Sequence, residues 1–245
     1  MEQLFYTKLA KYYDKIYNYV DYKNQASFIL MLVRKFKTNN GNKLLDVACG
    51  TGSHIKFLKK HFKITGLDKS KEMLEIARKK NPEVMFIQGD MGNFDLHKKF
   101  DVIICYFNSI LYNTTEEKLY KTLANFWKHL NEGGVLIFNS ADKVVAVDSR
   151  KEEYFYRGKN LNILFAPQWI YKNKKLYIDI DFIIEKGKKK EKLKDFHTMG
   201  AFGFFKIKSL LHKIGFKVNV FETNYKKLEQ LNPKSWQAIF VCRKH

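Results

Sequence analysis

A short segment with two glycines marks the place where this sequence could bind a polar ligand. Residues 44–53 read Leu-Leu-Asp-Val-Ala-Cys-Gly-Thr-Gly-Ser. Gly50 and Gly52 carry no β-carbon, so the backbone can bend sharply there and approach a ligand closely. The segment predicts a strand, a tight turn and the start of a helix, whose first N–H groups lack intrahelical partners and can meet a polar ligand group.

Two common cofactor loops do not fit this segment. A nicotinamide fingerprint needs Gly-x-Gly-x-x-Gly or Ala, whereas the third residue after Gly52 is Ile55, and an acidic residue, Asp46, lies inside the end of the expected strand. A phosphate-binding loop needs Gly-x-x-x-x-Gly-Lys followed by Ser or Thr, and the sequence has no such run. The glycine loop therefore indicates another kind of cofactor.

Acidic residues at the ends of the next two expected strands indicate a nucleoside. Asp68 lies roughly 20 positions after the glycine loop, where an acidic side chain can accept hydrogen bonds from ribose hydroxyls. Asp90 follows the third expected strand and can accept from an exocyclic amine. The polarizable side chain of Met91 suits the face of a flat ring.

Together these segments resemble the class I methyltransferases that use S-adenosylmethionine. The matching runs are Asp-Val-Ala-Cys-Gly-Thr-Gly-Ser-His, Gly-Leu-Asp-Lys-Ser-x-x-Met-Leu-x-x-Ala-Arg and Gln-Gly-Asp-Met, and within the class they are most similar to the dTDP-aminosugar N,N-dimethyltransferases. The resemblance implies S-adenosylmethionine as the cofactor, with the glycine loop at its methionine part, Asp68 at the ribose, and Asp90 and Met91 at the adenine. The implied cofactor-binding residues are Tyr13, Asp46, Ala48, Gly50, Gly52, Asp68, Lys69, Met73, Asp90, Met91 and Phe107.

The resemblance also implies residues on the acceptor side. Tyr112 matches a His or Tyr position near the acceptor amine, and His197 matches a family His in an added sheet. Plain packing of a tyrosine ring and of a histidine in a sheet is the competing interpretation. An amine must lose a proton before it attacks, which calls for a nearby base; the candidates are Tyr112, His197 and the lid tyrosines Tyr13 and Tyr17. Where the nucleotide-sugar enzymes carry a Pro-Trp-Trp-like segment, residues 139–143 read Asn-Ser-Ala-Asp-Lys.

Apolar spacing predicts the elements that must position these residues. Ser70 is expected to cap a helix, Thr114 and Glu117 to form a capping box, and Gly215 to end a helix. Helices are expected over 23–37, 52–61, 70–80, 114–130 and 204–214, and core strands over 43–48, 63–67, 84–88, 100–107, 135–139, 216–221 and 236–242. Strand-like segments are expected within 152–185 and 191–200, among them 161–165, 169–171 and 176–184.

The alternation of strands and helices predicts a Rossmann-like, doubly wound α/β fold. We expect a mainly parallel seven-stranded sheet with an antiparallel edge strand, an N-terminal helical lid and an added antiparallel sheet. Residues 1–40 form the lid, 41–140 the cofactor-binding core, 141–200 the acceptor-side insertion and 201–245 the end of the core sheet, all in a single domain. Ligands of such sheets lie beyond the carboxyl ends of the strands.

Composition narrows the class of protein further. With 245 residues, of which 45% are hydrophobic and 16% aromatic, the chain can bury one substantial core and is not disordered. No apolar run approaches the roughly 18–20 residues of a membrane span, and no signal peptide is recognisable. We therefore expect a cytoplasmic protein with no membrane partner. The cysteines and histidines show no metal-ligand spacing, so no metal is expected.

The net charge of +20 raises the alternative of a nucleic-acid partner, although the lysines are scattered rather than gathered in one stripe. The favoured interpretation is methylation of a small-molecule amine, with a nucleotide-linked amino sugar as one candidate acceptor. Methylation of RNA (tRNA) or protein stays open as an alternative, and a non-catalytic cofactor-binding module is a third. The sequence is compatible with a homodimer and does not decide the oligomeric state.

Overall fold

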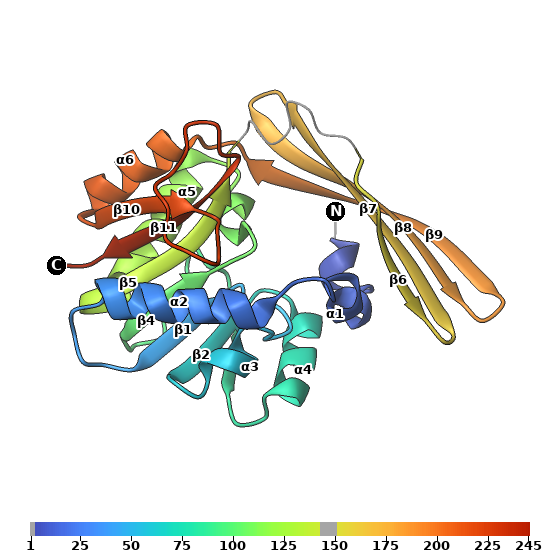
Figure 1. The fold of residues 1–245 in the computed structure, drawn as a ribbon, viewed down its shortest axis with the longest axis horizontal. Helices are drawn as coiled ribbons and strands as arrows, with labels where there is room; N and C mark the ends of the chain where they lie inside the picture. Colours follow the sequence, from blue (N-terminus) through green and yellow to red (C-terminus); the bar gives the residue numbers. More distant parts are fainter. Residues whose placement is uncertain (1–2, 143–150) are drawn as a thin grey trace.

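The computed structural model describes residues 3–142 and 151–245, which form an α/β body with a long β extension (Figure 1). Seven strands make the central sheet, in the order β10-β11-β5-β4-β1-β2-β3, and four make a second sheet, β6-β7-β8-β9. The predicted fold class is confirmed, while residues 143–150 of the expected insertion lie outside the described residues. The central strands are β1 (Lys43–Val47), β2 (Lys63–Asp68), β3 (Met85–Gln88), β4 (Phe100–Cys105), β5 (Leu130–Ala141), β10 (Lys217–Glu222) and β11 (Gln237–Arg243).

The strand order creates a switch point beside β1. Strands β1, β2 and β3 follow one another in one direction, whereas β4 pairs with the opposite edge of β1, and all of these pairings are parallel. Strand β11 is antiparallel to both β5 and β10, so the reversed strand lies one place inside the edge. Open sheets of this kind bind ligands where the strand order reverses, which places the expected site beyond the ends of β1 and β4.

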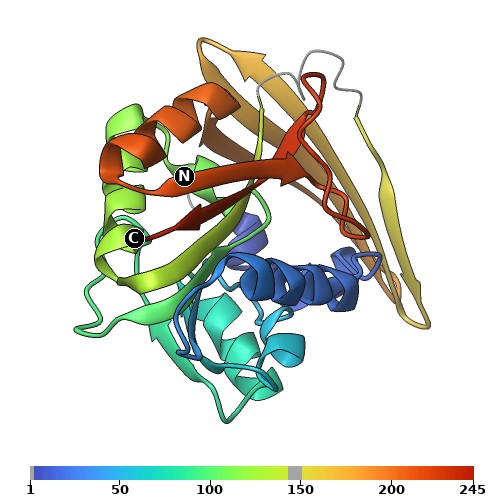
Figure 2. The same cartoon turned by 60° about the vertical axis from the view of Figure 1, so that its left-hand side comes forward.

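Helices cover both faces of the central sheet (Figure 2). Alternate residues of a strand point to opposite faces: Leu44 and Ile104 pack with α2, whereas Leu45 and Ile103 pack with α5 and α6. Because both faces are buried, the inner strands read as continuous apolar runs. The helices are α1 (Tyr13–Ile16), α2 (Tyr22–Phe36), α3 (Ile55–Leu58), α4 (Lys71–Lys80), α5 (Glu116–Lys128) and α6 (Phe204–Ile214), with 3-10 turns η1 (Leu4–Tyr6), η2 (Ala10–Tyr12) and η3 (Ser109–Tyr112).

Helix boundaries follow local hydrogen bonding. Ser70 caps α4 by accepting from the Met73 N–H, as predicted, and Gly215 ends α6 in a left-handed conformation. The predicted capping box at Thr114 is wrong by one residue, because Thr115 accepts from the Lys118 N–H and caps α5. Thr115 has the extended backbone that an N-cap requires.

Two elements near the site are shorter than the sequence suggests. The helix expected over 52–61 is reduced to α3, because Gly52 has a φ of +73° and its N–H closes a turn on Cys49 before the helix begins. The strand expected over 100–107 ends at Cys105, because Phe107 and Asn108 have φ of 58° and 55°. A strand needs extended backbone, so the left-handed conformation of Phe107 and Asn108 ends β4 before them.

The added sheet contains longer strands than predicted. They are β6 (Tyr154–Gly158), β7 (Leu161–Lys172), β8 (Lys175–Lys186) and β9 (Lys189–Gly200), all antiparallel. The segments expected at 161–165 and 169–171 form one strand despite Pro167 between them. The carbonyl of Pro167 accepts from the Glu152 N–H, so the nitrogen of Pro167, which points to the same side, faces away from β8. The N–H that proline lacks is therefore not needed for pairing with β8.

The N-terminal lid packs on the inner face of the added sheet. Phe5, Leu9 and Ile16 are buried against Phe165 and Phe182 from β7 and β8. The first visible residues of the chain therefore lie beside strands formed much later in the sequence (Figure 1). In the part of the chain that is described, no helix has both the length and the apolar character needed to span a bilayer.

Candidate active site

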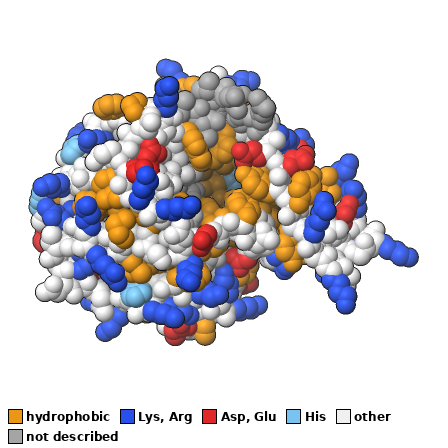
Figure 3. Space-filling model, viewed as in Figure 1, with side chains coloured by type: hydrophobic (Ala, Val, Ile, Leu, Met, Phe, Trp, Pro, Cys, Tyr) orange, Lys and Arg blue, Asp and Glu red, His pale blue; other side chains and the backbone are white. Residues whose placement is uncertain are grey.

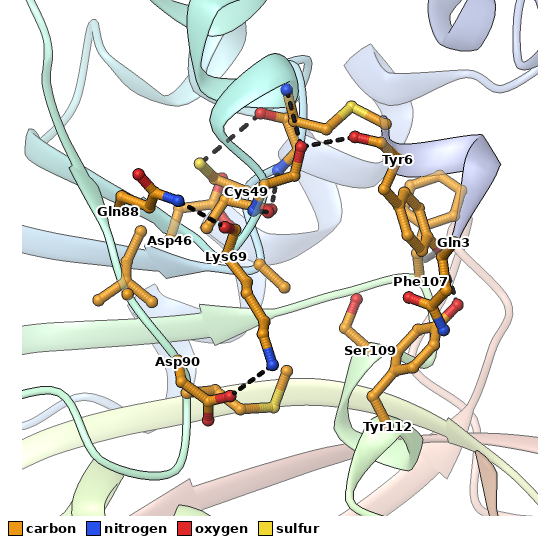
Figure 4. Close-up of a pocket in the computed structure, with 18 of the residues that line it drawn as sticks. Gln3, Tyr6, Asp46, Cys49, Lys69, Gln88, Asp90, Phe107, Ser109 and Tyr112 are labelled. Atoms are coloured by element: carbon orange, nitrogen blue, oxygen red, sulfur yellow. Dashed lines mark hydrogen bonds and ion pairs between the residues drawn. The ribbon is translucent and has the colours of Figure 1, made fainter. Parts of the chain in front are cut away.

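A cavity of about 890 Å³ lies beyond the carboxyl ends of β1, β2, β3 and β4, at the switch point of the sheet. Figure 4 shows Asp46, Lys69 and Asp90 on one side of this cavity and Tyr6 and Tyr112 on the other. Its volume is in the range of sites that hold small molecules and cofactors, roughly 300–1,000 Å³. Sheet ends form the floor and the N-terminal lid contributes a wall.

The glycine loop and Asp68 form one hydrogen-bonded unit. Asp68 accepts from the Gly50 N–H at 2.8 Å and from the Ser70 N–H at 2.9 Å. Gly50 has a φ of +53°, and a β-carbon built there would meet nothing within 4 Å, so this glycine borders the open cavity. The loop thus brings its backbone to the cavity wall without a side chain in the way, as a cofactor cradle requires.

Buried polar atoms without partners gather at the glycine-loop end. Asp46 is only 3% exposed, and among the described residues its Oδ2 lacks a hydrogen-bond partner, as do the hydroxyls of Tyr22 and Tyr106. All three residues line the cavity. Because buried polar groups are normally paired, these atoms suit a polar ligand. The residues therefore fit the methionine part of S-adenosylmethionine.

The electrostatics of this end favour a positively charged ligand. Burial, together with the nearby Asp68 carboxylate, raises the pKa of Asp46 well above its ordinary value. Burial also raises the pKa of Asp68, although backbone N–H groups that donate to it offset part of the effect. A cation beside these carboxylates would favour their charged forms, and a sulfonium or an ammonium group would supply that charge.

Asp90 and Met91 line the cavity beyond the end of β3. Asp90 accepts from the Gly92 N–H at 2.9 Å and from Lys69 Nζ at 3.2 Å. Burial opposes ionisation, but these two donors hold the pKa of Asp90 below its ordinary value. Met73 is also part of this wall. The ionised carboxylate of Asp90 can therefore accept a hydrogen bond from an adenine ring, and the thioethers of Met73 and Met91 can contact it.

The structure brings most of the predicted residues to the cavity. The predicted residues that line it are Tyr13, Asp46, Ala48, Gly50, Asp68, Lys69, Met73, Asp90, Met91, Phe107 and Tyr112. Gly52 is not among them: a β-carbon there would come within 2.9 Å of Asn81 Nδ2. Its lack of a side chain therefore allows close packing of the loop against Asn81, rather than contact with a ligand.

Tyr17 and His197 also lie outside the cavity wall. The ring of Tyr17 packs among Phe5, Tyr13, Phe107 and other aromatic rings of the lid and the added sheet. Tyr17 is therefore one ring away from the cavity, behind Tyr13 and Phe107, and its role as a base stays a prediction. His197 is 1% exposed and contacts two residues that line the cavity, Tyr112 through a hydrogen bond and Tyr6 through ring packing.

A chain of hydrogen bonds runs from the cavity into the added sheet. The hydroxyls of Tyr6 and Tyr112 lie 2.7 Å apart, and the Tyr112 hydroxyl lies 2.5 Å from Nδ1 of His197. Nε2 of His197 lies 2.9 Å from Oδ2 of Asp195. We name this chain, Tyr6–Tyr112–His197–Asp195, the relay. It joins the lid, η3 and β9 at one edge of the cavity.

Charge along the relay is set by burial and by donors. Burial opposes ionisation of Asp195, but donation from His197 and from the Phe5 N–H holds its pKa below the ordinary value. Burial raises the pKa values of Tyr6 and Tyr112 well above the ordinary value. With Asp195 ionised and accepting from Nε2–H, Nδ1 of His197 is left free to accept from the Tyr112 hydroxyl.

Two members of the relay were not predicted. Asp195 stands two residues before His197, and period-two alternation in a strand places both on one face, so that signal was available. Tyr6 belongs to a tyrosine-rich segment in which no spacing distinguishes one ring from the next. Its role depends on how the lid packs, which local patterns do not specify.

Comparison with known proteins agrees with this geometry. Residues 44–134 match the model of a methyltransferase domain family. A dTDP-3-amino-3,4,6-trideoxy-alpha-D-glucopyranose N,N-dimethyltransferase from Streptomyces venezuelae is 44% identical over 48% of this chain and 49% of its own length. A glycine/sarcosine N-methyltransferase from Halorhodospira halochloris is 31% identical over 58% and 55%. The chain spans about half the length of these curated relatives.

The solved structures extend the likeness to the whole fold. The crystal structure of Streptomyces venezuelae DesVI superposes with a TM-score of 0.81 and 28% identity, covering 92% of both chains. Residues 44–134 thus match a methyltransferase domain, and the whole fold and its cavity are similar to those of S-adenosylmethionine-dependent methyltransferases. Among the relatives, the sequence is similar to dTDP-aminosugar N,N-dimethyltransferases.

Proposed function

We propose that the protein transfers a methyl group from S-adenosylmethionine to the amine nitrogen of a small molecule. The observation that carries this proposal is the continuity of one cavity, which is lined by the glycine loop and Asp68 at one end and by Tyr6 and Tyr112 of the relay at the other. S-adenosylmethionine, when bound, supplies a methyl group that is already electrophilic. The protein then has to position the acceptor, exclude water and accept a proton.

Roles for the cofactor-binding residues follow from where they line the cavity. Asp46 and the backbone around Gly50 would hold the methionine part, and Asp68 would accept from the ribose hydroxyls. Asp90 would accept from the exocyclic amine of adenine. Phe107, which follows β4 and lines the cavity, would cover the reacting end. Ala48, Lys69, Met73, Met91 and Tyr13 would complete the walls.

The relay provides a path for the proton of the acceptor amine. Its raised pKa keeps Tyr112 protonated at neutral pH, so this tyrosine cannot act as a base unless it passes its own proton on. As the amine gives its proton to the Tyr112 oxygen, Tyr112 gives its own proton to Nδ1 of His197. The imidazolium that forms is stabilised by the buried carboxylate of Asp195. General bases of this kind contribute about 10²–10⁴-fold to rates.

The relatives support an amine as acceptor and leave its carrier open. One acts on an amino sugar linked to a nucleotide and the other on glycine or sarcosine, so an aliphatic amine is common to both. A nucleotide-linked amino sugar is our first candidate. Lys and Arg side chains are spread over the face in Figure 3 rather than gathered in a groove, which favours a small acceptor over a nucleic acid.

The test is transfer of labelled methyl groups from S-adenosylmethionine to a panel of acceptors. The panel holds dTDP-linked amino sugars, glycine, sarcosine and simple primary amines, with tRNA and denatured protein as separate arms. We expect labelling of at least one small amine, and His197→Ala should greatly reduce it. Labelling of tRNA or protein alone would overturn the proposal. Absence of cofactor binding by calorimetry would overturn the methyltransferase assignment itself.

A further inference from the structure

A charged cluster joins the lid to the glycine loop and to α4. Oδ1 of Asp14 accepts from the hydroxyls of Thr51 at 2.5 Å and Ser53 at 3.3 Å. Oδ2 of Asp14 accepts from Nζ of Lys80 at 2.8 Å, and the same ammonium donates to Thr51 at 3.2 Å and Ser53 at 3.0 Å. The polar side-chain groups of Asp14, Thr51, Ser53 and Lys80 are thus in mutual contact. We name this set, Asp14, Thr51, Ser53 and Lys80, the clasp.

The position of the clasp relates it to the cavity. Tyr13, the neighbour of Asp14 in α1, lines the cavity, and so does Thr51, which lies directly after Gly50. The Thr51 side chain is 1% exposed and turns its hydroxyl toward the lid carboxylate. Two hydroxyls that belong to the glycine motif thus fix the lid.

Other polar contacts hold the lid at different places. The Ser70 hydroxyl donates to the Tyr6 carbonyl at 2.6 Å, and the Phe5 N–H donates to Asp195 at 2.7 Å. These contacts fasten the beginning of the lid to α4 and to the relay. The clasp fastens α1 of the lid to the glycine loop, which borders the cavity.

We propose that Asp14 is a positioning residue whose clasp holds the lid closed over bound cofactor and sets how fast the cofactor leaves. The inference rests on the proposed function, since it takes S-adenosylmethionine as the occupant. Lid residues form part of the cavity wall, so a lid held by the clasp slows release. Because Asp14 and Lys80 are partly exposed, salt screening weakens the clasp.

The experiment compares the full chain with Asp14→Asn, Asp14→Glu and a matched control, Glu185→Gln. The control removes one carboxylate charge from a surface ion pair with Lys190 at 2.8 Å, on the added sheet and away from the cavity. Stopped-flow release and calorimetry measure cofactor binding, and urea unfolding measures stability. For Asp14→Asn we expect the release rate and the Kd of the cofactor to rise about five- to tenfold. This is the effect expected from the loss of about one charge-assisted hydrogen bond that holds the lid.

A second readout follows the lid itself. Lys8, Lys11 and Lys15 are trypsin sites within the lid. Without cofactor, Asp14→Asn should be cut at these lysines several times faster than the wild type, whereas Glu185→Gln should be cut at the wild-type rate. Asp14→Glu should recover part of the slow cutting and slow release. Saturating cofactor should protect the wild-type lid better than the Asp14→Asn lid.

Distinct outcomes separate the clasp from the proposed function. Release, Kd and lid cleavage of Asp14→Asn equal to those of Glu185→Gln would overturn the clasp. A parallel fall in kcat and urea midpoint with unchanged release would also overturn it, because that pattern indicates general destabilisation. A wild type that binds no S-adenosylmethionine would reject the proposed function, and faster trypsin cleavage of Asp14→Asn would still support closure of the lid by the clasp.

Discussion

At the glycine-loop end of the cavity, the polar groups come from strand ends and loops between Asp46 and Met91. At the other end, the relay joins residues far apart in the sequence: 106 positions separate Tyr6 from Tyr112, and 85 separate Tyr112 from His197. The first end depends mainly on backbone geometry. The second depends on how a lid and an added sheet dock. The difference separates an end of the cavity that is built locally from an end that is built by tertiary docking.

The largest effect should come from the cofactor end. Asp68→Ala removes the acceptor for the Gly50 and Ser70 N–H groups and, in the proposed cofactor site, for the ribose hydroxyls. We expect the Kd for S-adenosylmethionine to rise about 100-fold, since hydrogen bonds to a charged group contribute about 1.5–3 kcal/mol each. Isothermal titration calorimetry measures the change.

The matched control for this substitution is Asp95→Ala. Asp95 also accepts from a backbone N–H, that of His97 at 2.9 Å, and pairs with Lys128, but it does not line the cavity. Its loss should leave cofactor affinity unchanged. Equal affinity in Asp68→Ala and Asp95→Ala would contradict the assignment of the cofactor end.

The relay should affect turnover instead of cofactor affinity. His197→Ala and Tyr112→Phe each interrupt proton transfer, and we expect kcat to fall about 100-fold, the lower range for loss of a general base. The Kd for S-adenosylmethionine should change less than threefold. Steady-state kinetics with the best amine of the panel, together with calorimetry, separates the two quantities.

His129→Ala is the control for removing a buried imidazole. His129 is buried and bonds to Leu96 and Asn125 away from the cavity. That variant should lose stability and keep its kcat. If His197→Ala instead lost affinity for the cofactor and kept its kcat, the division of roles between the two ends would be wrong.

The smallest effect is a gain in stability. Asp46 has a raised pKa in the folded state, so the folded protein binds a proton more readily than the unfolded chain. Stability therefore falls as the pH rises above the unfolded pKa of about 3.9. Asp46→Asn removes this dependence and should raise the free energy of unfolding by ~1–2 kcal/mol at pH 7, with little change near pH 4. It should also weaken cofactor binding.

Asp101→Asn provides the contrast for Asp46→Asn. Asp101 is also buried, but it accepts from the Lys43 N–H at 2.9 Å and from Asn131 at 2.8 Å. Its replacement should lower stability at pH 7, as measured by urea unfolding. A similar loss in Asp46→Asn would show that the Asp46 carboxylate already has a partner within the folded chain.

The part of the site that sequence could predict is the part made locally. Asp46, Gly50, Asp68 and Asp90 lie at strand ends, where strand periodicity and the glycine spacing place them without knowledge of the remaining fold. Gly52 was assigned to the ligand although it packs against Asn81, because a missing β-carbon gives no indication of which neighbour requires it. The length of the loop around Gly52 does not show whether a ligand or a protein side chain occupies that space either.

The acceptor end could be predicted only in fragments. His197 and Tyr112 were found through resemblance, while Tyr6 depends on tertiary packing. Tyr13 and Tyr17 belong to the same tyrosine-rich lid segment, but side chains on one short segment can point in different directions, and only Tyr13 lines the cavity. The two segments expected at 161–165 and 169–171 form the single strand β7, because Pro167 turns its nitrogen away from β8 and so removes no hydrogen bond of that pairing.

Phe5 of the lid bonds to Asp195 across 190 positions, and this separation has a consequence for folding. During synthesis, the apolar side chains of Phe5, Leu9 and Ile16 must wait for β7 and β8 before they can be buried. Contacts of such high sequence separation are slow to form because a long loop must close first. The nascent glycine-loop region can thus acquire its local structure well before the lid docks.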